Sequence, residues 1–414
     1  MPLSEGVSQT IAWKQYAIGT ITAGTEAVSS SDLGASGAQY LRRVGSTLSL
    51  KKATYQSAEI RSDRQIADFR HGGRSVSGSI TGELSPLTFF PFFEAVHRDT
   101  KVSALTLTQT QLTSVTASHS GSTFTFAGGD PVALGLSVGQ VIRFTNLSVT
   151  ADNNQNFLIT GISGASNRIL TVSPAPTDQT LDSTFSLSRP GCTTIVPLSG
   201  HVSRKFGIES YGSDIDISRL FTECRASMYK ITAPSTGMVT TEFGFQGRDQ
   251  EVYVTAAAPF FTSPTANSTT GIVSAVNGSL FVAGVSSGVV TGIDFGCDLS
   301  PTAATVLGQN FAAEIFLGRA NITGTVTAYF DSATLINDFL NETEVSLDVM
   351  MTTTSATNSP FINFYFPRVK FSDAAINLQG EGGQTISMPF QALLVPVTTG
   401  IKQSTVLIHD SEAT

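Results

Sequence analysis

Residues 72–96 read GGRSVSGSITGELSPLTFFPFFEAV, and residues 318–342 read GRANITGTVTAYFDSATLINDFLNE. When the two stretches are aligned without gaps, five of the 25 positions are identical. The pairs that carry the similarity are Gly72 with Gly318, Val76 with Ile322, Gly78 with Gly324, Ile80 with Val326, Thr88 with Thr334 and Phe93 with Phe339. This match predicts that one β module occurs twice in the chain.

A second pair of stretches supports the duplication. FTECRASMYKITAPSTGMVTTEFGFQG (221–247) resembles FYFPRVKFSDAAINLQGEGGQTISMPFQAL (364–393), because each holds a strand, a glycine-containing turn and a strand that ends in Phe-Gln. Gly72 to Arg225 spans 153 residues, whereas the apparent equivalents Gly318 to Arg368 span 50. The first copy is therefore expected to carry roughly a hundred extra residues near 104–200, where short strands and glycine-rich turns predict a small β barrel or sandwich.

Residues 75–84 alternate strictly between two faces, which is typical of a strand with one buried side. Val76, Gly78, Ile80, Gly82 and Leu84 share one face, and hydroxyl residues and Glu83 share the other. The glycines on the apolar face leave room for a neighbouring aromatic ring or a close backbone.

A helix is expected directly after this strand. Ser85 is a suitable N-cap, and Pro86 suits the first helical position. The apolar face of the helix would consist of Phe89, Phe92, Phe93 and Val96, while Pro91 either kinks the helix or shortens it. In the second copy Asp331 takes the cap position, and Leu335 and Phe339 supply the apolar face.

The fold class expected from these patterns is mainly β, with two tandem β-sandwich or barrel modules, a helix flanking each module, and an inserted small β domain. The expected boundaries are an N-terminal arm that orders against neighbours at 1–40, a first module at 41–103 and 201–258, an inserted domain at 104–200, a linker at 259–275, a second module at 276–397 and a polar C-terminal tail at 398–414.

Composition limits the classes of function. Charged residues make up 14% of the chain, below the usual quarter, so its surface must be rich in uncharged polar residues that suit wet subunit contacts. The net charge of −8 argues against a general nucleic-acid binder. The sequence offers no signal peptide and no apolar run long enough to span a membrane. Cys192, Cys224 and Cys297 are expected to be reduced and buried.

The segment at 51–74 is dense in charge. It contains Lys51, Lys52, Glu59, Arg61, Asp63, Arg64, Asp68, Arg70 and Arg74. Asp63, Asp68 and His71 lie close enough in sequence for a metal or acid–base cluster, but the interleaved arginines would pair with these carboxylates first. A nucleic-acid patch is a second alternative. An inter-subunit contact made by paired charges is the favoured interpretation, because long charged connections in compact β domains are usually functional or disordered.

The sequence contains no motif that predicts an enzyme. The five histidines, His71, His97, His119, His201 and His409, are scattered and form no HExxH pattern. The AGGDPVALG stretch lacks the Lys-Ser or Lys-Thr of a phosphate loop. Catalytic, cofactor and metal sites are therefore all predicted to be absent.

Several blocks resemble a known family. They are LRRVGSTLSLKKATYQSAEIRSDRQIADFRHGGRSVSGSITGELSP (41–86), TGMVTTEFGFQGRD (236–249), PFFTSPTANSTTG (259–271) and GRANITGTVTAYFDSATLINDFLNETEVSL (318–347). Together they are similar to the tail tube proteins of long, flexible, non-contractile tailed bacteriophages. The blocks occur in order and cover most of the chain outside 104–200, where the similarity is least.

The resemblance implies a structural virion protein whose rings stack into a hollow tube that conducts DNA to the host. Inner sheets would join edge to edge around each ring, and the long early loop, here 51–74, would contact the adjacent ring. In the second module 299–317 takes that place, with Glu314 as its one formal charge. The implied partners are further copies of the chain, a tape measure protein in the lumen, tail terminator and tail-tip proteins, and phage DNA in passage. The chain would be made in the host cytoplasm.

Two hypotheses extend the resemblance. Three chains with two modules each would give a ring with pseudo-sixfold symmetry, although six chains per ring is the alternative. The lumen is expected to be acidic and weakly adhesive for DNA. A virion-surface or extracellular β adhesin or decoration protein is the second candidate function; it predicts a discrete particle rather than an open polymer.

Overall fold

The strand predicted at 75–84 is the second half of β5 (Phe69–Glu83). Its predicted inner face is confirmed, since Val76, Ile80 and Leu84 are all buried. A Cβ on Gly82 would lie 2.5 Å from the Phe89 ring, and one on Gly78 would lie 2.5 Å from the carbonyl oxygen of Thr47. The two glycines therefore make room for an aromatic ring and for a close backbone, as expected.

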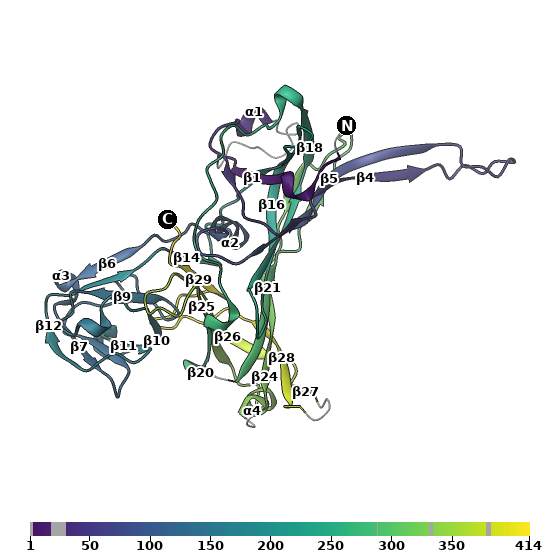
Figure 1. Ribbon diagram of the computed structural model, residues 1–414. Coiled ribbons are helices and arrows are strands. Elements are labelled where there is room, and N and C mark those ends of the chain that lie inside the picture. The colour runs from purple at the N-terminus through teal and green to yellow at the C-terminus, as the bar shows by residue number, and fades with distance from the viewer. Residues whose placement is uncertain (1–2, 18–29, 288, 331–333, 378–381) are drawn as a thin grey trace.

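The computed structural model describes residues 3–17, 30–287, 289–330, 334–377 and 382–414. It is mainly β, and the strands within its sheets pair antiparallel, which confirms the expected fold class. Nineteen strands form one hydrogen-bonded network, and eight others form a separate sheet. Figure 1 shows a long hairpin that projects from one side of the body and the eight-stranded sheet on the opposite side.

Two four-stranded units make up the central part of the network. The first half-sheet consists of β3 (Gly45–Ser46) with β4 (Ser49–Gln56), then β5, β17 (Thr240–Gly247) and β16 (Ile217–Ala233). The second half-sheet consists of β21 (Val290–Asp298), β24 (Asn321–Tyr329), β28 (Thr385–Ala392) and β26 (Phe361–Phe371) with its continuation β27 (Ala375–Asn377). The strand order along the chain is the same in both.

The two half-sheets also share their register. Gly78 lies opposite Phe245 in the first, and Gly324 lies opposite Phe390 in the second. The register of β16 against β17 shifts by one residue between Ala226 and Met228. A shift of one residue also occurs between the register of β26 against β28 and the register of β27 against β28.

One residue pair in the sequence alignment is wrong by two positions. Arg225 pairs with Gln246, and Lys370 pairs with the equivalent Gln391. Lys370 is therefore the counterpart of Arg225, whereas the sequence comparison matches Arg225 with Arg368. Similar residues two apart on one strand face the same side, so the pattern alone does not separate them.

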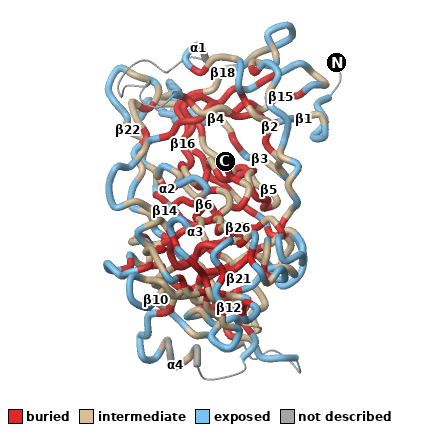
Figure 2. The backbone as a smooth tube through the Cα atoms, turned by 90° about the vertical axis from the view of Figure 1, so that its left-hand side faces the viewer, coloured by how far each residue is buried: buried red, intermediate tan, exposed pale blue. Residues whose placement is uncertain are grey.

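The half-sheets join edge to edge within the chain. β16 pairs antiparallel with β21, from Met228 opposite Asp298 to Ala233 opposite Ile293. The result is one continuous sheet in the order β4, β5, β17, β16, β21, β24, β28, β27. A single apolar core lies against its inner face and includes residues of both half-sheets (Figure 2). Phe364 contacts Phe93 and Phe295 in this core, at ring-centroid distances of 5.7 and 4.9 Å.

A second layer of strands covers this core. β16 and β26 belong to both layers, because their N-terminal halves pair with a different set of neighbours. The second-layer strands are β1 (Gln9–Gln15), β2 (Gln39–Tyr40), β14 (Cys192–Ile195), β15 (Phe206–Gly212), β18 (Asp249–Val254), β19 (Gly278–Val282), β20 (Val285–Ser287), β25 (Val345–Thr352) and β29 (Leu407–Asp410).

One helix packs beside each half-sheet, as expected. α2 (Phe90–His97) buries Phe92 and Phe93 in the core, and Phe339 of α4 (Thr334–Leu340) packs against the same core. The predicted start of α2 is wrong: Ser85 and Pro86 precede it, and Pro91 occupies the first helical turn, where its missing N–H costs nothing. Pro91 thus shortens the helix without kinking it. Asp331 lies outside the described residues, as does the side chain of Leu335.

The segment between α2 and β14 contains the eight-stranded sheet. Its strands are β6 (Leu105–Thr108), β7 (Val115–Ser118), β8 (Thr123–Phe126), β9 (Val141–Thr145), β10 (Phe157–Ser163), β11 (Ile169–Ser173), β12 (Gln179–Asp182) and β13 (Ser186–Arg189), with the short helix α3 (Gln109–Leu112) after β6. The sheet has its own apolar core, but Tyr365 and Leu407 from β26 and β29 complete that core. It therefore packs on the second half-sheet, although it is inserted in the first.

Both ends of the chain differ from the predicted arm and tail. β1 pairs with β15, and Ala12 and Trp13 are buried. β29 is buried and pairs with β14 and β26. The short apolar run at 406–408 drives this burial, since three successive apolar residues fit a strand that is covered on both faces. The short helix α1 (Ser30–Leu33) lies between β1 and β2.

Candidate assembly surfaces

The outer face of the continuous sheet is polar. Alternate residues of β5, β17, β24 and β28 present hydroxyl and amide side chains there, namely Ser77, Ser79, Thr81, Gln246, Thr323, Thr325, Thr327, Ser387 and Gln391. The carboxylates on this face are Glu83, Glu242, Asp294 and Asp298. Lys230 is an exposed cation on this face, and Arg225 and Lys370 lie opposite Gln246 and Gln391 at its end.

This sheet ends in two edges that are paired on one side only within the described residues. β3 and β4 pair with β5, and β27 pairs with β28. An edge strand presents unpaired N–H and C=O groups and is a template for another strand. The β16–β21 pairing shows how such edges join, because β21 is the counterpart of β3 and β4 and β16 is the counterpart of β26 and β27.

The charged segment at 51–74 forms most of a long two-stranded arm, β4 and β5 with the turn between them (Figure 1). Eight of its nine predicted contact residues are exposed along the arm, and Arg74 lies at the base, where it pairs with Asp249 at 2.6 Å. The predicted pairing of arginines with carboxylates is present, since Arg61 binds Asp63 at 3.0 Å and Arg70 binds Asp68 at 2.7 Å.

The corresponding segment of the second half-sheet, 299–317, forms a hairpin of β22 (Thr302–Ala304) and β23 (Glu314–Phe316). Its register matches that of the arm: Thr302 pairs with Phe316 as Tyr55 pairs with Arg70. Unlike the arm, this hairpin lies against the first half-sheet. The Arg74 N–H donates to the carbonyl of Asn310 at 2.7 Å, at the base of the arm.

Buried charges fix the β22–β23 hairpin. Glu314 accepts from Lys205 at 3.2 Å and pairs with Arg225 at 3.2 Å. Burial opposes the ionisation of Glu314, but the N–H of Ile315 and the two cations outweigh it and lower the pKa of the carboxyl. Lys205 also binds Glu223 at 2.8 Å; Lys205, Glu223 and Arg225 are buried, and Glu314 is partly buried.

Arg248 extends the network. It binds Glu223 at 2.5 Å, donates from Nε to the carbonyl of Ala312 at 2.6 Å, and places its guanidinium 5.0 Å from the centre of the Phe311 ring. The sequence analysis missed this cluster. Its signal was the occurrence of two opposite charges, Glu223 and Arg225, on either side of Cys224 in the long strand β16, since buried charges need partners.

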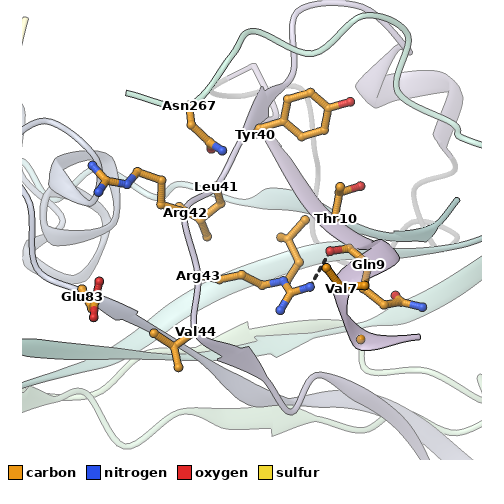
Figure 3. A pocket seen from close by; sticks show the side chains of 12 residues that line it. Val7, Gln9, Thr10, Tyr40, Leu41, Arg42, Arg43, Val44, Glu83 and Asn267 are labelled. Carbon is orange, nitrogen blue, oxygen red and sulfur yellow. Dashed lines mark hydrogen bonds between the residues drawn. The ribbon is translucent and has the colours of Figure 1, made fainter. Parts of the chain in front are cut away.

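A groove of about 560 Å³ lies beside the start of β3 (Figure 3). Arg42 and Arg43 line it, but both guanidinium groups already donate to backbone carbonyls, Arg42 to Thr270 at 2.7 Å and Arg43 to Gln9 at 2.5 Å. Glu83 is its carboxylate. The groove has no nucleophile beside a base, so its geometry does not match a hydrolytic site.

The three cysteines and two of the five histidines are buried. The three cysteines are free and buried, as predicted, and burial raises the pKa of each thiol, that of Cys297 to about 12. Burial lowers the pKa of His97 and His409 to about 3, so both rings are neutral at pH 7. Among the described residues, no group of three or more His, Cys, Asp and Glu side chains could hold a metal ion.

No helix of the described residues is both long enough and apolar enough to cross a membrane. A search of the curated proteins found no match. A family model described as phage tail tube protein, however, matches residues 10–392, nearly the whole chain. That span includes both half-sheets, the arm and the inserted sheet. The chain therefore belongs to the phage tail tube protein family, as a structural component of the virion.

Proposed function

We propose that this protein polymerises as stacked rings of three chains into the hollow tail tube that conducts DNA to the host during infection. The observation that carries the proposal is the continuous sheet with one polar face, one buried face and an open edge at each end. Each half-sheet is interpreted as one tail tube module. Six such modules from three chains would close every edge in a ring, as strands do in a barrel.

The internal junction supplies a register for the junction between chains. If the edges of two chains join as β16 and β21 do, β27 of one chain lies antiparallel to β3 and β4 of the next. The pair Met228–Asp298 then has Asp373 opposite Lys51 as its counterpart. Both side chains are exposed in the single chain and have opposite charge. Opposite charges that face each other across strands stabilise a pairing, so this contact favours closure of the ring.

The polar face is the proposed lumen. It is lined by hydroxyl and amide side chains with Lys230 as an exposed cation, while Glu83, Glu242, Asp294 and Asp298 repel phosphate. Binding to DNA depends largely on Lys and Arg contacts to phosphates, which release counterions. A lumen of this composition would let DNA pass without retention, and it would hold a tape measure protein before ejection.

The hairpin tips are proposed to contact the adjacent ring. Ile60 at the tip of the arm and Leu307 at the tip of the β22–β23 hairpin are equivalent in register, and both are fully exposed apolar side chains. Exposed apolar residues that recur at matched positions mark an interaction site. The charged residues nearest the tip of the arm, Glu59, Arg61 and Asp63, would add ion pairs to this inter-ring contact. The end rings would meet the tail terminator and tail-tip proteins.

Cryo-electron microscopy of the purified protein after synthesis in a bacterial cytoplasm tests the proposal. Stacked rings with three chains each are the expected result. Six chains per ring would retain the tube but reject the two-module interpretation. Discrete particles that never polymerise would reject the tube and favour a virion-surface adhesin or decoration protein.

A further inference from the structure

A groove on the second half-sheet matches a site that is already filled on the first half-sheet. The groove has a volume of about 530 Å³ and lies where β24 begins and β28 ends. Its lining includes Arg319, Ala320, Ala392, Leu393 and Leu394. By the shared register, their counterparts on the first half-sheet are Gly73, Arg74, Gly247, Arg248 and Asp249.

On the first half-sheet these counterpart positions hold residues 310–315 of the chain's own β22–β23 hairpin. Arg74 forms a parallel bridge with Phe311, and Arg248 donates to the carbonyl of Ala312. Arg225 donates to the carbonyl of Ile315 at 2.7 Å. Ala312 and Ile315 are 3% and 1% exposed, so this half-sheet buries the hairpin's apolar side chains.

The equivalent part of the arm is residues 64–69, and it is exposed together with Arg70. Ile66 is the counterpart of Ala312, and Phe69 is the counterpart of Ile315, yet Ile66 is 65% and Phe69 50% exposed. Asp68 is the counterpart of Glu314. The arm projects away from the rest of the chain, so its own chain does not cover these residues (Figure 1).

We infer that residues 64–70 of one copy fill the groove on the second half-sheet of the neighbouring copy in the same ring. This inference rests on the proposed ring, because edge pairing of β27 with β3 and β4 brings the arm over the groove. Leu393 and Leu394 replace Arg248 and Asp249 in the lining, so the groove is more apolar than its counterpart. Ile66 in place of Ala312 matches that change in size and polarity.

Charge complementarity supports the same occupant. Glu314 pairs with Arg225 within the chain, and the counterparts of these residues are Asp68 and Lys370. Lys370 is 38% exposed at its side chain and pairs with the exposed Glu342 at 3.4 Å. Exposed pairs of this kind contribute little, so Asp68 could join or replace Glu342 as the partner of Lys370. The nearby Glu344 is held by Arg368 at 2.6 Å, so its charge is compensated and does not repel Asp68.

A disulfide test separates this docking from the general ability to polymerise. The variant Asp68→Cys with Lys370→Cys is assembled, oxidised without reductant and then denatured for electrophoresis. Docking within a ring predicts covalent products that stop at three chains. A ladder without an upper limit would place the arm in the groove of another ring and overturn the inference. Tubes that form but give no cross-link would also overturn it, while leaving the proposed function intact.

Two controls complete the experiment. Glu59→Cys with Lys370→Cys moves the thiol towards the hairpin tip and should give no cross-linked product. The charge variants Asp68→Lys and Lys370→Glu should each slow assembly about tenfold, which corresponds to about 1.4 kcal/mol. Their combination should restore the rate. If the unmodified chain forms no tubes at all, the proposed function fails rather than the docking alone; if the combined variant is as slow as either single change, the proposed ion pair is rejected.

Discussion

Gly78 lies where the backbone of the neighbouring strand leaves no room for a side chain. Its φ is +152°, and a Cβ would lie 2.5–2.7 Å from Thr47 and Leu48 backbone atoms. Gly78→Ala should therefore lower the free energy of unfolding by about 1–3 kcal/mol, since backbone atoms cannot rotate away. Gly73→Ala is the control, because a Cβ there meets nothing within 4 Å. Equal stability of the two variants in denaturant titrations would contradict the prediction.

Asp410 predicts a dependence of stability on pH. Burial raises its pKa to about 7, although the N–H groups of Glu412, Leu87 and Ala413 partly stabilise the anion. The folded state then holds a proton that the unfolded state has released between about pH 4 and 7, so this residue makes stability fall as pH rises through that range. From pH 5 to pH 8 the loss should be up to about 3 kcal/mol.

Asp410→Asn should remove this contribution while keeping a side-chain acceptor. The measurement is urea unfolding of the unassembled chain at pH 5 and pH 8, with the exposed Asp373→Asn as the control. The buried His97 and His409 act in the opposite direction, because they lower the stability of the protein as pH falls. Both histidines are present in every variant, so their contribution cancels when the variants are compared. A pH dependence that Asp410→Asn leaves unchanged would assign it to other groups.

At the scale of residues, the sequence predicts which face of a strand is buried better than it predicts where an element begins or which residues are equivalent. The buried face of β5 and the roles of Gly78 and Gly82 follow from a period of two residues, which a single sequence displays. The match of Arg225 to Arg368 and the cap at Ser85 do not hold. The first depends on the register between distant strands, and the second on the turn before Pro91. In both cases neighbouring residues of similar type fit the sequence pattern equally well.

Deletion of the inserted eight-stranded sheet has a clear expected outcome. Val102 and Thr193 exchange two backbone hydrogen bonds of 2.8 and 2.9 Å, so the ends of the insert lie side by side. Replacing 104–191 with a short Gly-Ser link should therefore preserve the connection. A deletion that continued to 197 would also remove β14, which pairs with β29.

The excised chain should nevertheless aggregate, because Tyr365 and Leu407 lose the core that covers them. Phe361 loses contacts with Val141 and Leu158 in the same way. Changing these three residues to threonine in the excised chain should restore a soluble, cooperative fold, measured by size-exclusion chromatography and thermal unfolding. A soluble, stable chain after excision alone would show that the packing against β26 and β29 contributes little.

At the scale of elements, the sequence predicts the insert because it interrupts the repeated pattern, and it marks the 51–74 segment by its density of charge. It does not predict where they pack. The insert docks on the second half-sheet through Gly139, whose carbonyl accepts from Asn363 at 2.8 Å. The β22–β23 hairpin folds onto the first half-sheet through Arg225 and Arg248. Such long-range contacts join residues more than 60 positions apart and leave no local period in the sequence.

The whole molecule should fold as one cooperative body rather than as two independent modules. The β16–β21 pairing joins the half-sheets, β14 pairs with β29 from the other end of the chain, and the partly buried Glu314 pairs with the buried Lys205 and Arg225. Removing one partner of a buried charge network leaves an unpaired charge that costs several kcal/mol. A fragment that ends before β21 would expose both the edge of β16 and this network.

Splitting the chain at residue 275 tests this cooperativity. Fragments 1–275 and 276–414 should each lack a cooperative thermal transition when made separately, and mixing them should recover one transition at a concentration-dependent temperature. Circular dichroism and calorimetry give the measurement, with the intact chain as the control. A sharp transition in the isolated 1–275 fragment would mean that the first half-sheet is a self-sufficient domain, and that the shared core around Phe364 adds stability without being required for folding.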